Sequence, residues 1–164
     1  MDKRIFEYKG NIYPSYIKKG NACSFIIPYA KEFCTGKGLD IGGFLDWTFP
    51  GARAVNVTLK DGFDAYNLPK GKYDYIFSSH TLEHLPNYVK AIEYWKSFLK
   101  KDGVLFLYLP HPDMEYWLPQ NNRKHFHLFD PKDIEKLFYD LGFKHVLVSE
   151  RDLYWGFAAV GFVS

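Results

Sequence analysis

The chain has 164 residues, 47% of them hydrophobic, which is enough for one buried core and too little for two, so we expect a single domain over residues 1–164. Its 21 basic and 19 acidic residues give a formal net charge of +2 without a long run of either sign, which argues against nucleic acid as a partner. Neither a signal peptide nor an apolar run of membrane-spanning length is recognised, and the two cysteines fit no disulfide framework. These features predict a cytoplasmic protein without a membrane partner.

In chain order, the first predicted element is a helix over 22–33 that contains Pro28. A short apolar strand over 38–42 then leads into a glycine turn. Two further strands are predicted over 52–58 and 73–79.

In the second half, apolar residues recur at helical spacing over 88–100, and Lys101-Asp102-Gly103 is expected to end that helix. Asp130 and Pro131 have the composition of an N-cap and a first helical residue. The remaining predictions are a strand over 103–109, a helix through residue 141, and strands over 146–148 and 158–163.

Alternation of strands and helices predicts an α/β fold with a mainly parallel sheet. Ligands of such sheets bind at the carboxyl ends of the strands, beside the point where the strand order reverses. The segments that end the predicted strands are therefore candidates for a site, namely 40–44, 56–58, 78–84 and 110–113.

Four phrases carry a family resemblance: GLDIGG at 38–43, DAYNLP at 64–69, YDYIFSSHTLEHL at 73–85 and LKKDGVL at 99–105. Their identity and order resemble the class I S-adenosylmethionine-dependent methyltransferases, in the small-molecule branch known as type 11. The resemblance implies a three-layer Rossmann-like sandwich in a reduced form, with S-adenosylmethionine as cofactor. It further implies methyl transfer to a small molecule, and similarity to short enzymes of this kind suggests a sugar or glycan precursor.

The resemblance also assigns cofactor-binding residues. Asp40, Gly42 and Gly43 lie at the first strand end and its glycine turn, and Asn56 lies at the second strand end. Asp64 and Ala65 are the pair that contacts the adenine. Ser79 and His80 lie at the end of the third strand. The chain departs from the family at Phe44 and Asp46, where further glycines are usual, and at Asn56, where a carboxylate usually binds the ribose. As structural alternatives, the glycines simply form a tight turn, Asn56 is an ordinary strand-end residue, and Asp64 belongs to an Asx turn.

Segment 44–53 is too short for the long first helix of the family, and 58–64 has no room for its next helix and strand. One face of the sheet should therefore be thinly covered. Self-association through an aromatic surface, as a homodimer, is a hypothesis that follows.

Methyl transfer requires a positioned acceptor and in some cases a base, and a histidine titrates near neutrality. His80 and His111 follow predicted strands and are the candidate catalytic residues. A loop residue without a catalytic role is the alternative for His111. His125 and His127 are interpreted as a solvated basic loop, and no metal site is assigned.

Two other functions are weighed. His80-Thr81-Leu82-Glu83-His84 spells the H-x-x-E-H pattern of some zinc hydrolases, although it follows a strand directly, precedes Pro86 and has no identified third ligand. Loss of catalysis, with retention of the fold as a binding module, is the other alternative, favoured by Phe44, Asp46 and Asn56.

Overall fold

The computed structural model describes residues 4–19 and 22–164. Its helices are α1 (Cys23–Ala30), α2 (Tyr88–Phe98) and α3 (Pro131–Asp140). Its strands are β1 (Ile5–Tyr8), β2 (Asn11–Pro14), β3 (Gly38–Ile41), β4 (Arg53–Val55), β5 (Tyr73–Ser79), β6 (Leu99–Pro110), β7 (Lys144–Val148) and β8 (Gly156–Phe162). Single 3-10 turns lie at Ser15–Lys19, Leu45–Trp47, Val57–Leu59, Leu82–His84 and Glu115–Trp117.

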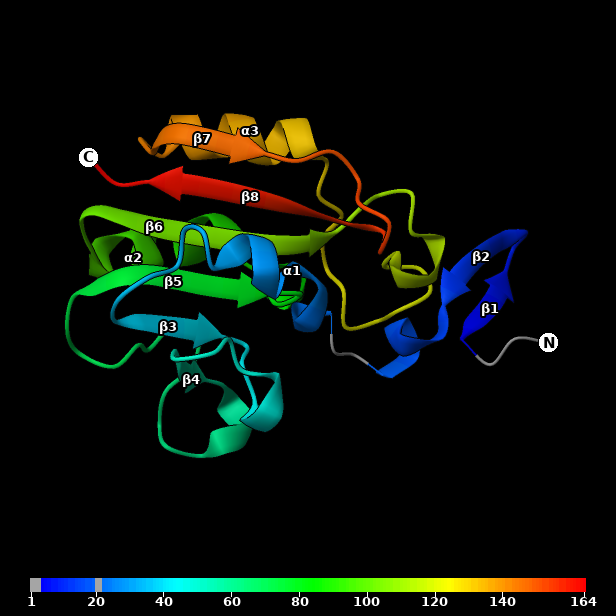
Figure 1. Ribbon diagram of the computed structural model, residues 1–164, viewed down its shortest axis with the longest axis horizontal. Helices are drawn as coiled ribbons and strands as arrows, with labels where there is room; N and C mark the ends of the chain where they lie inside the picture. The colour runs from blue at the N-terminus through cyan, green and yellow to red at the C-terminus, as the bar shows by residue number, and fades with distance from the viewer. Residues whose placement is uncertain (1–3, 20–21) are drawn as a thin grey trace.

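A six-stranded sheet with the order β4-β3-β5-β6-β8-β7 forms the centre of the fold (Figure 1). The pairs β4·β3, β3·β5 and β5·β6 are parallel, whereas β8 is antiparallel to both of its neighbours. Strand order reverses between β3 and β5, since the chain moves outward from β3 to β4 before it returns to the other side of β3. The predicted mainly parallel α/β sheet is confirmed.

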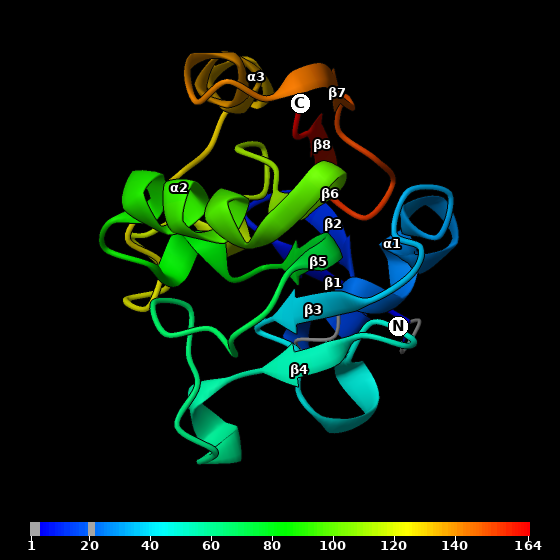
Figure 2. The same ribbon diagram turned by 90° about the vertical axis from the view of Figure 1, so that its left-hand side faces the viewer.

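Helices lie on both faces of this sheet, which gives the predicted three layers. Figure 2 shows α2 and α3 on one side and α1 on the other. The first face is filled by a large apolar cluster that includes Trp95, Ile134 and Phe138. On the second face α1 and the loop residue Phe49 cover Phe77 and Phe106. As expected from the shortened segments, no α-helix occupies 44–53 or 58–64.

Several predicted boundaries were wrong. The helix predicted over 22–33 ends at Ala30, two residues after Pro28. The strand predicted over 52–58 ends at Val55, because the side chain of Asn56 accepts a hydrogen bond from the backbone N–H of Thr58 and caps a 3-10 turn. The helix expected to end at 101–103 ends at Phe98, and the following strand already begins at Leu99.

The β1–β2 hairpin was not predicted. Its turn residues Lys9 and Gly10 have φ angles of 48° and 79°, the left-handed conformation of a tight hairpin turn. Tyr13 of β2 is fully buried and packs with Met114 in a small cluster next to the end of β6. The hairpin therefore lies at the edge of the sheet where the parallel strands end (Figure 1).

No helix within the described residues is both long and apolar enough to cross a lipid bilayer. The longest, α2, has 11 residues.

Candidate functional site

A cavity of about 610 Å³ opens at the carboxyl ends of β3, β4 and β5, beside the reversal of strand order. Four sequence-predicted residues line it: Gly42, Asn56, Ala65 and His80. The other lining residues are Ile41, Trp47, Val55, Val57, Thr81, His84, Leu85 and Lys124. The topology has thus brought together residues from three predicted strand ends and from the loop between β4 and β5.

Gly42 forms the turn that leaves β3. Its φ of 98° lies in the left-handed region, and a Cβ atom here would lie 1.9 Å from the hydroxyl oxygen of Thr81. Its N–H donates to the carbonyl oxygen of Val55 over 2.8 Å, so the turn is tied to the end of β4. Only glycine satisfies both the backbone conformation and the close approach of Thr81.

Asn56, at the end of β4, uses both the nitrogen and the oxygen of its side-chain amide in contacts within the protein. Its Nδ2 donates to the carbonyl oxygen of Gly42 over 3.1 Å. Its Oδ1 accepts from the backbone N–H and the hydroxyl of Thr58, over 3.0 and 2.8 Å. Asn56 therefore couples the β4 end to the glycine turn and caps the following 3-10 turn, which fits the alternative of a structural residue at the strand end.

The loop that carries Asp64 and Ala65 is anchored from α2. The indole N–H of Trp95 donates to the carbonyl oxygen of Ala65 over 2.7 Å, and the backbone N–H of Leu68 donates to the hydroxyl of Tyr94 over 3.1 Å. Asp64 accepts from the N–H of Tyr66 over 2.7 Å, which is the Asx turn considered from the sequence. Ala65 contributes to the cavity wall, while Asp64 is not among the residues that line it.

Asp40, Gly43 and Ser79 are likewise not among the cavity residues. Asp40 is 2% exposed and accepts from the N–H of Phe49 over 2.7 Å, so it organises the loop after β3. Burial raises the pKa of Asp40 to about 7. A Cβ on Gly43 would lie 2.6 Å from the Asp40 carboxyl group, which explains that glycine by packing. The Ser79 hydroxyl is buried and has no hydrogen-bond partner among the described residues.

His80 follows β5 directly and is held in a left-handed conformation, with a φ of 49°. Its backbone N–H donates to the carbonyl oxygen of Tyr108 over 2.9 Å, which fixes it against the end of β6. Burial lowers the pKa of the imidazole to about 3, with smaller contributions from His125 and His84. His80 is therefore neutral near pH 7.

The buried side chain of Glu83 lies next to His80 and His84. Glu83 is 0% exposed, and its Oε1 lies 3.7 Å from His80 Nδ1 and 4.0 Å from His84 Nε2. Burial raises the pKa of Glu83 to about 8 and lowers that of His125 to about 4. The 3-10 turn Leu82–His84 replaces the long helix that an H-x-x-E-H zinc hydrolase would need, as the sequence predicted.

His125 is the residue that sequence reasoning missed. The sequence predicted that His125 belongs to a solvated loop, and this was wrong. The side chain is 3% exposed and packs edge-on against His84, with ring centroids 4.5 Å apart. Its partners come from the turn after β5, so nothing in the local sequence around 123–127 could have identified them. His127 lies apart from this group, where its Nε2 is 2.9 Å from the carbonyl oxygen of Leu85.

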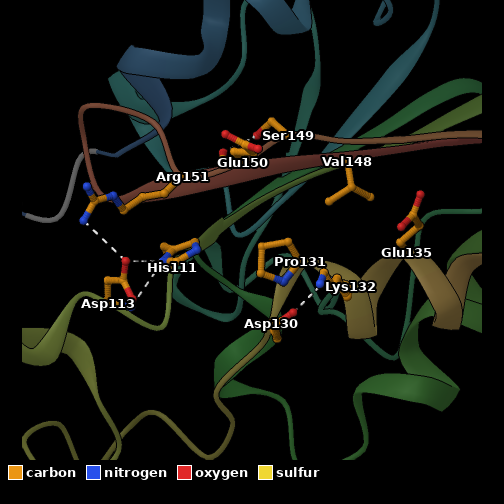
Figure 3. A pocket seen from close by; sticks show the side chains of 10 residues that line it. All are labelled: His111, Asp113, Asp130, Pro131, Lys132, Glu135, Val148, Ser149, Glu150 and Arg151. Atoms are coloured by element: carbon orange, nitrogen blue, oxygen red, sulfur yellow. Dashed lines mark hydrogen bonds and ion pairs between the residues drawn. The ribbon is translucent and has the colours of Figure 1, made fainter.

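His111 lines a separate hollow of about 550 Å³ between the end of β6, the start of α3 and the loop after β7 (Figure 3). Its Nδ1 accepts from the backbone N–H of Asp113 over 3.2 Å, and Asp113 also pairs with Arg151 at 3.4 Å. The two histidines predicted to be catalytic thus line different hollows.

Comparison with known proteins now gives the family. A family model described as a methyltransferase domain matches residues 18–148. No curated protein matches the sequence. Among solved structures, a methyltransferase from Thermotoga maritima has a TM-score of 0.68 at 14% identity, and the alignment covers 91% of this chain and 92% of that one. One from Archaeoglobus fulgidus has a TM-score of 0.65 at 16% identity, with 90% and 97% covered.

The first similar structure, a protein from Nostoc punctiforme assigned to the O-methyltransferases, has a TM-score of 0.65 at 15% identity over 90% of this chain. This chain spans only 59% of that protein's length, and 56% of the next, an S-adenosylmethionine-dependent methyltransferase. These comparisons favour neither the zinc hydrolase nor the binding module. Because the family model matches most of this chain and the sheet is a reduced form of the methyltransferase sheet, the chain belongs to the S-adenosylmethionine-dependent methyltransferase family.

Proposed function

We propose that this protein transfers the methyl group of S-adenosylmethionine to a small molecule, with the cofactor bound in the cavity at the ends of β3, β4 and β5. The observation that carries the proposal is the convergence on one cavity of Gly42, Asn56, Ala65 and His80, four residues that the family motifs singled out. Because this chain belongs to a methyltransferase family, a cavity at the strand-order reversal is the expected place for its cofactor.

The chemistry of the cavity fits the cofactor. Its volume of about 610 Å³ lies within the usual range for small-molecule sites. Val55, Ala65 and Leu85 offer an apolar wall to an adenine ring. Lys124 supplies a cation for the carboxylate of the methionine part. When bound, the cofactor supplies an electrophilic methyl group on a sulfonium.

The predicted residues differ in their roles in this proposal. Gly42, kept in place by Asn56, forms a turn without a side chain next to the cofactor. Asp40 and Gly43 act indirectly by shaping the loop that follows β3. By the family resemblance Asp64 contacts the adenine from the loop next to Ala65, whereas the buried Ser79 hydroxyl lies outside the cavity lining. His80 faces the acceptor and takes its proton. His111 either contacts the acceptor or acts only in the neighbouring hollow that it lines.

Within the class of small acceptors, a sugar or glycan precursor is the proposed substrate, by the resemblance to short methyltransferases. The aromatic content gives this narrower choice little support, because many rings are core residues, such as Phe77 stacked on Phe106 at 5.6 Å. A homodimer and a cytoplasmic location also stay predictions.

Titration calorimetry with S-adenosylmethionine tests the proposal, with Asp64→Ala and Asp61→Ala as a matched pair. Both aspartates cap turns of the same loop, through the N–H of Tyr66 and of Phe63. Only Asp64 has a proposed contact with the cofactor. Saturable binding that weakens in Asp64→Ala and persists in Asp61→Ala is expected, followed by a screen of methyl acceptors. Absence of binding at millimolar cofactor would contradict the proposal, and the alternative of a binding module without catalysis would then be favoured.

A further inference from the structure

We infer that Glu83, His84 and His125 form a binding site for one divalent transition-metal ion, of the kind zinc occupies. The ligand atoms of these three side chains all lie within 4.8 Å of one another. This site goes beyond the proposed methyl transfer and does not depend on it.

The tautomers of the two histidines leave the right nitrogen available. His84 Nδ1 lies 2.7 Å from the carbonyl oxygen of Lys124, and His125 Nδ1 lies 2.7 Å from the carbonyl oxygen of Trp117. A carbonyl oxygen only accepts, so each Nδ1 carries the proton and each Nε2 keeps a lone pair. Metal-ligating histidines characteristically donate their other N–H to a backbone carbonyl or a carboxylate in this way.

The buried polar atoms at the centre of the group lack partners. Both carboxylate oxygens of Glu83 and the Nε2 of His125 are buried without a hydrogen-bond partner among the described residues. Glu83 is 0% and His125 is 3% exposed. Leaving a buried carboxyl group unpaired is costly, and a cation among these atoms would bind one oxygen of Glu83 and the Nε2 of His125.

The donor set and its size suit zinc. Two imidazole nitrogens with one carboxylate oxygen match three-ligand zinc sites and accept Co²⁺ and Ni²⁺ as well. Bond lengths of about 2.0–2.2 Å place tetrahedral donors roughly 3.4 Å apart, so these donors, which lie within 4.8 Å of one another, need to close in by up to about 1.4 Å. His80 Nδ1, 3.7 Å from Glu83 Oε1, is left out of the donor set, because a metal-bound imidazole could not take the proton of an acceptor.

Two segments distant in the chain would be joined by the ion. The turn after β5 supplies Glu83 and His84, and the loop before α3 supplies His125. A backbone hydrogen bond from the N–H of Phe126 to the carbonyl oxygen of Glu83, over 2.8 Å, already aligns them. Because His84 and Lys124 line the large cavity, the ion would stabilise one of its walls.

The test is metal binding to the full chain after removal of bound ions with a chelator. We expect calorimetry with Zn²⁺ to give one equivalent per chain, and Co²⁺ to produce the visible absorption of a tetrahedral site with nitrogen ligands. Glu83→Gln, His84→Ala and His125→Asn should each weaken binding at least ~10-fold. Zinc should also raise the Tm of the wild type by more than that of each variant at the same zinc concentration.

His145→Asn is the matched control. It removes an exposed imidazole outside the group, and asparagine tolerates the left-handed φ of 50° at this position. Full retention of the site is expected in this variant. A wild-type protein that binds no Zn²⁺ at micromolar concentration would overturn the inference whether or not any variant folds. Equal binding by wild type and all three ligand variants would overturn it too, since the ion would then lie elsewhere.

Discussion

The side-chain amide of Asn56 donates to the carbonyl oxygen of Gly42 over 3.1 Å and so ties the end of β4 to the glycine turn after β3. This contact gives Asn56 a positioning role at the place where related enzymes use a carboxylate for the ribose. An aspartate here cannot donate, and its charge would face the Gly42 carbonyl oxygen. We therefore expect Asn56→Asp and Asn56→Ala both to weaken cofactor binding, by about fivefold for the loss of a hydrogen bond worth ~1 kcal/mol.

Calorimetry with S-adenosylmethionine measures this effect. Thr58→Val is the control, because it removes one partner of the Asn56 side chain and leaves the contact to Gly42 intact. Its affinity should match that of the wild type. Tighter binding by Asn56→Asp would show that a direct carboxylate contact to the ribose outweighs the positioning of the turn.

Gly42→Ala is expected to destabilise the protein more than Gly51→Ala. Both glycines have positive φ angles, 98° and 85°, so an alanine is strained at either position. The new Cβ would overlap the Thr81 hydroxyl at Gly42, whereas it meets nothing within 4 Å at Gly51. The difference between the two variants isolates the packing contribution, which we expect to exceed ~1 kcal/mol in urea unfolding. Equal losses would mean that Thr81 moves aside freely.

The central strands could be predicted because apolar and aromatic residues are concentrated in them. Tyr73–Ser79 is bounded in the structure as predicted, since parallel strands buried on both faces leave a strong local signal. Asp130 caps α3 through the backbone N–H of Lys132, and Pro131 opens the helix, as their composition indicated. These features depend on neighbouring residues alone.

Features that depend on distant contacts could not be predicted. The β1–β2 hairpin turns at Lys9-Gly10, and lysine is a weak signal for a left-handed turn position. Asn56 ends β4 early because its own side chain competes for the backbone N–H of Thr58. His125 joins Glu83 only through the tertiary fold, so the sequence supported a solvated loop instead.

Replacing Asp40 by asparagine should remove one contribution to the pH dependence of stability. Burial raises the pKa of Asp40 from 3.8 to about 7 in the folded protein. The folded state therefore retains a proton that the unfolded state loses, and this group lowers stability as pH rises from about 4 to about 7, by ~1.4 kcal/mol per pH unit. The amide oxygen of the asparagine would still accept from the N–H of Phe49, so the Asp40 contribution to the slope should disappear without loss of the loop, while the contribution of Glu83 remains.

Urea unfolding midpoints between pH 4.5 and 7.5 measure this slope. Asp74→Asn is the control, because the bond to Lys100 lowers the pKa of Asp74, and its contribution is lost only at pH values below about 4. That variant should keep the wild-type slope between pH 4.5 and 7.5. An unchanged slope in Asp40→Asn would mean that Asp40 is ionised in the folded protein.

The two candidate bases should separate in kinetics, because only His80 lines the proposed cofactor cavity. With an acceptor from the screen, His80→Ala is expected to lower kcat by about 10²-fold or more, the usual contribution of a general base. Affinity for S-adenosylmethionine should change far less. His111→Ala should retain most of kcat, with any effect confined to the KM of the acceptor. Since burial holds the pKa of His80 at about 3, its imidazole is unprotonated at any pH from about 5 to 8, and its role as a base requires that the bound acceptor raise this pKa. We therefore expect no His80-dependent change in the wild-type rate near pH ~6.5. A change at that pH that is present in the wild type and absent from His80→Ala would contradict this, because it would show that His80 titrates as an exposed histidine does.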